Sequence, residues 1–331
     1  MTYTSGSLIQ ATDYNGFVST TSGANINDIW GTGSTDKGWG QTPLTTTSAG
    51  STVTATQWAQ LVNTTSSMGS QTGTTITSRS APTAGTTISV LAAVNTDLTN
   101  ITTNRGNAVG SGTTSSTWTG STAKTTATGT GGTTWTITFT HTVTFGSADQ
   151  ARYFWNAGGL VLLDMSKTST GTDNDPDWNT FIGTIGTLSM SGRVNSANQL
   201  INAVTYTGFT RTGGTGTPSP NLTTTGWYTL TAGAAATTMW QLNSTVAPYT
   251  GDYVRVTAAK NAGATVLTLV TTWFNAGDVN VGASTNISGG SDTTSGGAFG
   301  TAPAVRCRFV PPSLTYLTGS WGTPAVAASV V

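Results

Sequence analysis

The sequence predicts a mixed α+β fold that is mainly β, with short N-terminal helices followed by an antiparallel β-sandwich domain. Three observations predict this class. Apolar residues recur at helical spacing in the first third of the chain, a stretch rich in Gly, Ser and Thr follows, and the remainder alternates between polar and apolar residues and is divided by turn residues. We therefore expect a helical docking and oligomerisation region at 1–108, a linker at 109–131 and a β-sandwich domain at 132–331.

Two segments of the helical region carry helix signals. The first has an apolar face, and the second opens with Thr54 and Gln57, which fit the N-cap and N3 positions of a capping box. The apolar positions of the first segment are Tyr14, Phe17, Val18, Ile26, Ile29 and Trp30, and those of the second are Trp58, Leu61, Val62 and Met68.

A third segment places Leu91, Val94, Leu98 and Ile101 at 3-4-3 spacing. This spacing suits a short seam between two helices. We interpret these four residues as a candidate oligomerisation surface, with a homotrimer favoured.

The β-rich remainder begins with an alternating stretch, WTITFTHTVTF, from Trp135 to Phe145. Side chains of a β-strand point to opposite faces in turn, so this pattern predicts a strand with one apolar face and one face of threonine alone. We expect the threonine face to meet solvent or a neighbouring subunit. Its residues are the candidate surface or interface strand: Thr136, Thr138, Thr140 and Thr142.

Further strands are predicted at ARYFWNA and LVLLDMS, which Gly158-Gly159 would join as a hairpin, and at QLINAVTYTGF. GDYVRVTA and TVLTLVTTWF form a second predicted hairpin around KNAGA, and AVRCRFV and SLTYLTGSW follow. One helix is predicted at DPDWNTFIGTIGTL, with Asp175 as N-cap and Pro176 at N1.

Composition limits the function classes. Charged residues make up 7% of the 331 residues and the net charge is zero, against roughly 25% charged residues in an ordinary globular protein. No basic patch supports nucleic-acid binding, and no apolar run is long enough to insert into a membrane. The hydrophobic fraction of 36% and the 11 Trp argue against disorder. So little charge leaves a free monomer poorly protected against association, which favours an assembly.

No residue pattern indicates an active site, a cofactor site or a metal centre. Asp173, Asp175 and Asp177 alternate as calcium ligands do, but the Gly and Glu of an EF-hand loop are absent, and we favour helix capping. His141 is the only histidine and falls on the apolar face of its strand, while Cys307 is expected to be a buried small hydrophobe. The chain has no glutamate, and no spacing singles out a pair of catalytic aspartates.

Tryptophans at loops and strand ends have two interpretations. They could stack on sugars, or they could pack in the core or at subunit interfaces, and we take packing as the default. The residues concerned are Trp118, Trp155, Trp227, Trp240, Trp273 and Trp321.

Several stretches together resemble structural proteins of tailed bacteriophages of the marine and cyanobacterial type. They are SGSLIQATDYNGFV, NDIWGTGSTDKGWGQT, SAGSTVTATQWAQLVN, DQARYFWNAGGLVLLDMSK, TGWYTL and YTGDYVRVTAAKN. The resemblance implies a non-enzymatic virion protein, such as a tail fibre or other appendage. It carries no catalytic motif.

On this interpretation the chain is made in the host cytoplasm, because no signal peptide is visible, and ends up on the virion. Its partners would be further copies of itself, other virion proteins bound through the N-terminal region, and a glycan or protein of the host surface, with no nucleic acid and no membrane insertion. Two alternatives stay open: a head or neck decoration protein without host contact, and a polysaccharide depolymerase.

Overall fold

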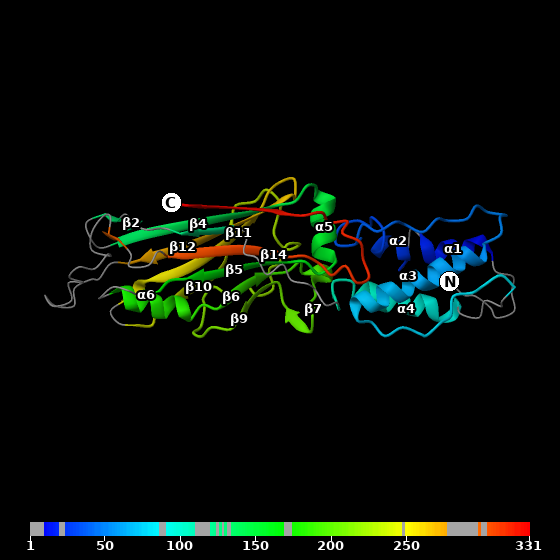
Figure 1. Cartoon of the computed structure of the whole chain (residues 1–331), viewed down its shortest axis with the longest axis horizontal. Helices are drawn as coiled ribbons and strands as arrows, with labels where there is room; N and C mark the ends of the chain where they lie inside the picture. Colours follow the sequence, from blue (N-terminus) through cyan, green and yellow to red (C-terminus); the bar gives the residue numbers. More distant parts are fainter. Residues whose placement is uncertain are drawn as a thin grey trace.

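The chain folds into an elongated body with helices at one end and sheets at the other (Figure 1). The computed structural model describes residues 10–19, 24–85, 91–109, 120–123, 126–127, 129–130, 134–168, 174–246, 249–276, 297–298 and 303–331. Helices α1 to α4 lie at the end that carries the N-terminus, and two packed antiparallel sheets make up the other end (Figure 1). The predicted class, α+β with short N-terminal helices and an antiparallel β-sandwich, is confirmed.

The helical end is built around α3, whose start is fixed as the sequence predicts. Thr54 accepts a hydrogen bond from the N–H of Gln57 (3.2 Å), and the Gln57 side chain accepts one from the N–H of Thr54 (2.9 Å). Gly73 ends the helix in the left-handed conformation, with φ of 64°. The four helices are α1 (Ala11–Val18), α2 (Ile26–Ile29), α3 (Ala55–Thr72) and α4 (Leu91–Thr103).

The predicted oligomerisation seam on α4 is corrected by the structure. Val94, Leu98 and Ile101 are at most 1% exposed and belong to the same core cluster as residues of α3, against which α4 packs. These three side chains therefore pack against α3 within one chain and are not available for contacts between subunits. The side chain of Leu91 lies outside the described residues.

The β end is a sandwich of two main sheets. The first has the order β10-β11-β12-β4-β15, with β3 also pairing with β4, and the second has the order β1-β14-β5-β6-β9. Two small sheets pair β7 with β8 and β2 with β13. The strands of the first sheet are β3 (Gly129–Thr130), β4 (Thr134–Thr144), β10 (Thr237–Asn243), β11 (Tyr253–Lys260), β12 (Val266–Asn275) and β15 (Ala325–Val330). The others are β1 (Gly120–Ala123), β2 (Thr126–Ala127), β5 (Leu160–Ser166), β6 (Thr187–Met190), β7 (Gln199–Ile201), β8 (Val204–Tyr206), β9 (Phe209–Thr212), β13 (Gly297–Ala298) and β14 (Ala304–Val310).

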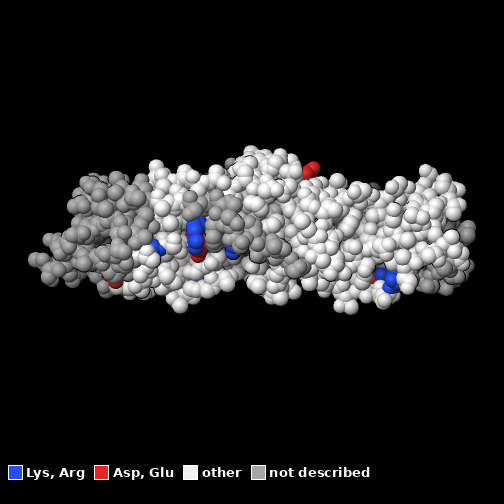
Figure 2. Space-filling view, viewed as in Figure 1, with Lys and Arg blue, Asp and Glu red and all other residues white. Residues whose placement is uncertain are grey.

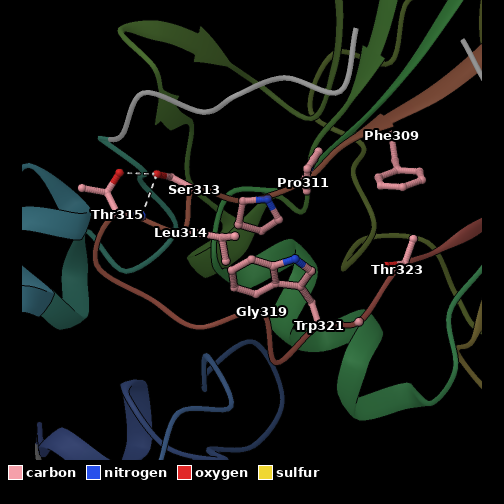
Figure 3. A pocket seen from close by; sticks show the side chains of 10 residues that line it. Phe309, Pro311, Ser313, Leu314, Thr315, Gly319, Trp321 and Thr323 are labelled. Carbon is pink, nitrogen blue, oxygen red and sulfur yellow. Dashed lines mark hydrogen bonds between the residues drawn. The ribbon is translucent and has the colours of Figure 1, made fainter. Parts of the chain in front are cut away.

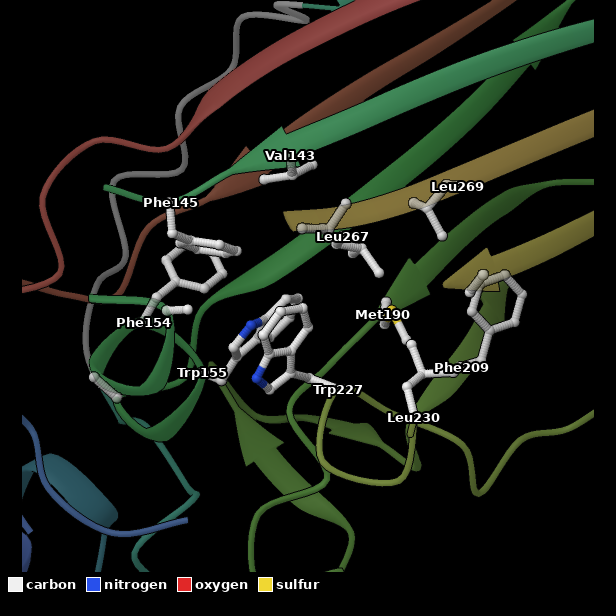
Figure 4. Packing of buried hydrophobic residues seen from close by; sticks show 14 of the residues in the cluster. Val143, Phe145, Phe154, Trp155, Met190, Phe209, Trp227, Leu230, Leu267 and Leu269 are labelled. Atoms are coloured by element: carbon white, nitrogen blue, oxygen red, sulfur yellow. The ribbon is translucent and has the colours of Figure 1, made fainter. Parts of the chain in front are cut away.

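A network of aromatic rings fills the space between the sheets (Figure 4). Trp155 and Trp227 stack with ring centroids 5.5 Å apart, and Trp178 and Trp273 stack at 5.7 Å. Packing is therefore the role of the tryptophans that the sequence placed at loops and strand ends. Trp155, Trp227, Trp240, Trp273 and Trp321 are all buried, and Trp118 lies outside the described residues.

The segment ARYFWNA, predicted as a strand, is instead part of helix α5 (Ala148–Asn156). Ser147 caps this helix by accepting a hydrogen bond from the N–H of Gln150 (3.1 Å). Gly158 then turns the chain at a φ of 96° into β5, so the two glycines join a helix to a strand and form no hairpin. The aromatic run Tyr153–Trp155 suggested a strand, but a helix places all three rings in one buried cluster.

Three further expectations differ in their bounds. A helix forms where one was predicted, but α6 (Asn174–Gly183) includes Asp175, so Asp175 is not the N-cap, and it ends before Thr187 and Leu188, which belong to β6. The described residues of 109–131 include β1, β2 and β3, because threonine-rich chain suits a pleated strand. SLTYLTGSW is a loop, and the last strand is β15, which follows Pro324.

Candidate functional site

The helical and β ends meet where a Gly-rich loop of residues 31–41 packs against α5, and we call this contact the waist. The indole of Trp39 donates a hydrogen bond to the carbonyl of Asn156 (3.1 Å), and the Asn156 amide donates one to the carbonyl of Gly38 (2.9 Å). Tyr228 donates its hydroxyl hydrogen to the Asn156 side-chain oxygen (2.8 Å). Because Asn156 is 1% exposed, these bonds are shielded from water and hold the two ends together.

An ion pair lies beside this contact. The Arg105 guanidinium contacts the Asp36 carboxylate at 2.7 Å, and the same carboxylate oxygen accepts a hydrogen bond from the N–H of Asn195 (2.6 Å). Burial raises the pKa of Tyr228, and the negative charge of Asp36 raises it further. These groups bond to one another across the contact, so the waist is a structural junction.

The carboxylates of the described residues are largely engaged by basic side chains. Besides Asp36, the ion pairs are Asp28 with Lys37, Asp97 with Arg79, Asp149 with Arg152, and Asp164 with Arg306. Within the described ranges, no three His, Cys or acidic side chains gather as metal ligands would.

The aspartates of the calcium-like stretch are placed by α6. Asp173 lies outside the described residues. Asp175 lies in the first turn of α6, and the structure does not describe its side chain. Asp177 is half-buried, and burial raises the pKa of its carboxyl. Within the described residues no group of three His, Cys or acidic side chains includes Asp177. Asp175 lies inside α6, so its predicted role as the N-cap is wrong.

His141 and Cys307 lie inside the sandwich, each with less than 1% of its surface exposed. Burial lowers the pKa of His141, with a smaller opposing effect from the backbone of Val305, so the imidazole is neutral near pH 7. Burial raises the pKa of the Cys307 thiol to about 12. Neither side chain can reach a dissolved substrate, so both belong to the core, as the sequence indicated.

The outward side of the first sheet is the surface that the alternation of β4 predicts. Thr136 is exposed, and Thr138, Thr140 and Thr142 are half-buried, while the residues between them are buried. We call this outward side the threonine face. It consists of Thr136, Thr138, Thr140 and Thr142 of β4 with their cross-strand neighbours Thr268, Val270, Thr272 and Phe274 of β12.

One charged side chain borders the threonine face. Arg255 of β11 pairs with Thr272, donates a hydrogen bond to the Tyr253 hydroxyl (3.1 Å) and covers the Tyr253 ring at 5.0 Å. Tyr253 in turn stacks on Phe274 with ring centroids 4.8 Å apart. On the side of the molecule in view in Figure 2, charged side chains of the described residues appear only at isolated points. The face offers the hydroxyl and methyl groups of its threonines, the side chain of Val270 and the ring of Phe274, and none of its residues is charged.

A cavity of about 660 Å³ lies under the loop between β14 and β15 (Figure 3). It is lined by Phe309, Pro311, Pro312, Ser313, Leu314, Thr315, Gly319, Trp321, Gly322 and Thr323, none of which is ionisable. Ser313 and Thr315 hydrogen-bond each other through their hydroxyls (2.9 Å). Gln41 fixes the same loop by accepting a hydrogen bond from the N–H of Thr318 (2.8 Å). The cavity can accommodate apolar groups, but it supplies no proton donor or acceptor of useful pKa.

Sequence reasoning missed the waist and this loop. The Gly-rich segment 31–41 gave no periodicity, and its partners lie more than 100 residues away in the chain. The signal present was the pair of aromatic and amide residues, Trp39 and Gln41, set among glycines.

Among the described residues no helix combines the length and the apolar character needed to cross a membrane. Comparison with protein-family models, with curated proteins and with solved structures gave no match.

Proposed function

We propose that this chain is a non-enzymatic structural protein of a tailed-bacteriophage virion, a fibre or other appendage of the particle. The threonine face is the observation that carries the proposal. A sheet surface of hydroxyl and methyl groups stays neutral whatever the ionic conditions outside a cell, and it can hydrogen-bond to a neighbour or to water. The resemblance of the sequence to phage structural proteins supports the same assignment.

The elongated shape suits a projecting component. The helical end and the β end lie at opposite ends of the long axis (Figure 1), and the buried bonds of the waist join them firmly. In this proposal the helical end docks on other virion proteins, and the β end points outward, where it contacts the host surface. The functional groups available within the described residues suit binding and packing better than catalysis.

Self-association is part of the proposal. A chain with 7% charged residues has few of the surface charges that keep monomers apart. We expect a homo-oligomer, with a trimer favoured. Because Val94, Leu98 and Ile101 are buried within the chain, the contacts between subunits lie elsewhere, and the threonine face is the first candidate for them.

Immunogold labelling of intact particles tests the assignment. Antibodies against the purified chain should label a projecting part of the virion. Label spread over the head lattice would instead favour the decoration protein, and label absent from particles would overturn the proposal. Light scattering on the purified chain measures the oligomer, and release of oligosaccharide from host polysaccharide would show a depolymerase.

A further inference from the structure

A small pocket lies between α6 and the end of β10. Figure 1 shows α6 at the end of the β body that is farther from helices α1 to α4. The volume of the pocket is about 130 Å³, and three separate segments of the chain form its walls. They are the end of α6 with Thr180 and Phe181 and the following Thr184, the turn with Thr215 and Gly216, and the stretch Leu242, Asn243, Ser244, Thr245 and Val246. The cavity under the β14–β15 loop, by contrast, is lined by one continuous segment.

The turn that closes this pocket is held in place by hydrogen bonds. The N–H of Thr215 donates to the carbonyl of Thr184 (2.7 Å). The guanidinium of Arg211 donates to the carbonyls of Thr215 and Gly216, both at 2.9 Å. Gly216 has a φ of 80°, and a Cβ there would lie 3.1 Å from a methyl carbon of Leu242. The pocket is therefore preformed, and its shape requires glycine at this position.

The lining has two chemical zones. Phe181 and Leu242 are 5% and 3% exposed and form an apolar floor. Exposed hydroxyl and amide side chains surround this floor, namely those of Thr180, Thr215, Asn243 and Thr245. No lining residue is ionisable, and the only nearby guanidinium that the described contacts reveal, that of Arg211, points at backbone carbonyls. The pocket thus favours a small uncharged ligand with an apolar side and several hydroxyl groups.

We propose that this pocket binds one ring of a neutral sugar. A hexose ring presents C–H groups on its faces, which fit against Phe181, and hydroxyl groups around its edge, which fit the threonine and asparagine side chains. An anionic sugar would lose hydration of its carboxylate without gaining a cation in the pocket. The inference deepens the proposed function, since it rests on the β end of the appendage being the end that meets a host surface.

Affinity for a single ring should be weak. A preformed site that contacts one small ligand binds with a dissociation constant on the order of 1 mM. Saturation-transfer NMR detects such binding on the purified full chain. The probes are the methyl glycosides of glucose, galactose and mannose, with N-acetylglucosamine and glucuronic acid alongside them.

We expect saturation transfer to at least one neutral probe and less to glucuronic acid. Thr215→Trp and Thr245→Trp add bulk at exposed positions of two different lining segments, and each should reduce the transfer at least fivefold. Thr99→Trp places the same side chain at an exposed position of α4, at the other end of the molecule, and should leave the transfer unchanged. Thermal unfolding monitors the fold of each variant.

Three outcomes would overturn the inference. The first is no transfer to any neutral probe at a probe concentration 20-fold above the expected dissociation constant of about 1 mM. The second is stronger transfer to glucuronic acid than to the neutral probes. The third is equal transfer in the wild type and in both filled variants. If the filled variants instead change the oligomer measured by light scattering, the pocket receives a side chain of another subunit and the sugar assignment fails. Immunogold labelling is independent of all these results, so the failure of the pocket and the failure of the virion assignment are distinguishable.

Discussion

The side-chain amide of Asn156 donates a hydrogen bond to the backbone carbonyl of Gly38 over 2.9 Å, across 118 positions of the sequence. This bond joins the end of α5 to the Gly-rich loop that follows α2. The same asparagine accepts the hydroxyl hydrogen of Tyr228 (2.8 Å). One buried side chain thus connects three distant parts of the chain, and its removal leaves buried polar groups without a partner.

Asn156→Ala should therefore lower the free energy of unfolding by about 1–3 kcal/mol, the cost of unsatisfied buried hydrogen-bonding groups. The midpoint of urea unfolding measures it. Asn100→Ala is the matched control, because Asn100 is exposed on α4 and surface changes stay within about ±0.5 kcal/mol. Equal midpoints for the two variants would show that the waist contributes nothing to stability.

Glycine at position 38 is required by its surroundings. Its φ is 92°, and a Cβ there would lie 2.1 Å from the carbonyl oxygen of Thr32. Gly50 has a similar φ of 82° but no atom within 4 Å of the added Cβ. Gly50→Ala should cost about 1–2 kcal/mol from backbone conformation alone. Gly38→Ala should cost at least about 2 kcal/mol more, because the clash adds to the strain.

Thermal or urea unfolding of the two glycine variants compares these costs. A similar loss for both would mean that the loop moves away from Thr32 at little cost. The loop at the waist would then be more deformable than its hydrogen bonds indicate.

The outward side of β4 should tolerate charge, and the inward side should not. Thr138→Lys places an ammonium on the threonine face and should change stability by no more than about 0.5 kcal/mol. Ile137→Lys places it among residues with no exposed surface, which costs several kcal/mol and should prevent folding. Circular dichroism and light scattering follow fold and assembly.

The two Thr138→Lys outcomes separate solvent from interface. A variant that folds but no longer assembles places the threonine face between subunits, and one that folds and assembles leaves it in water. Unfolding by Thr138→Lys with tolerance of Ile137→Lys would contradict the observed register.

The single histidine should make stability depend on pH in a narrow window. Burial lowers the pKa of His141 in the folded state, so the unfolded chain, with a pKa near 6.5, binds the proton first. Stability is therefore complete above pH ~6.5 and falls as the pH drops below it, with a slope of at most ~1.4 kcal/mol per pH unit.

His141→Phe should remove the slope that His141 contributes between pH ~5 and ~6.5. Urea midpoints across this range, measured for both proteins, check it. A wild-type curve that is flat over this range would mean that His141 is protonated equally in both states.

Cys307 should be inert in the folded protein. Its side chain has no exposed surface, and burial raises the pKa of its thiol to about 12, so almost no thiolate forms near neutral pH. A thiol reagent at pH 8 should modify it only after unfolding in urea. Modification within minutes under native conditions would show that β14 opens readily.

Local sequence determined the elements whose stabilising contacts lie close together in the chain. The capping box of Thr54 and Gln57 sets the start of α3 within four residues. The alternation of β4 fixes which side chains face the core, because the strand period of two admits one register, and KNAGA closes the β11–β12 hairpin. Composition and pattern together were enough for the class, the sandwich and the burial of His141 and Cys307.

Tertiary structure decided what depended on distant partners. The spacing of Val94, Leu98 and Ile101 is equally compatible with helix packing between subunits and with helix packing inside one chain. The packing of α3 against α4 shows that these residues pack inside one chain. The run at Tyr153–Trp155 is a helix in which Phe154 and Trp155 contact Phe145, and Trp155 stacks on Trp227 in the core. The waist and the pocket beside α6 join segments far apart in the chain. Loop closure leaves no local pattern, so these contacts appear only once the chain is folded.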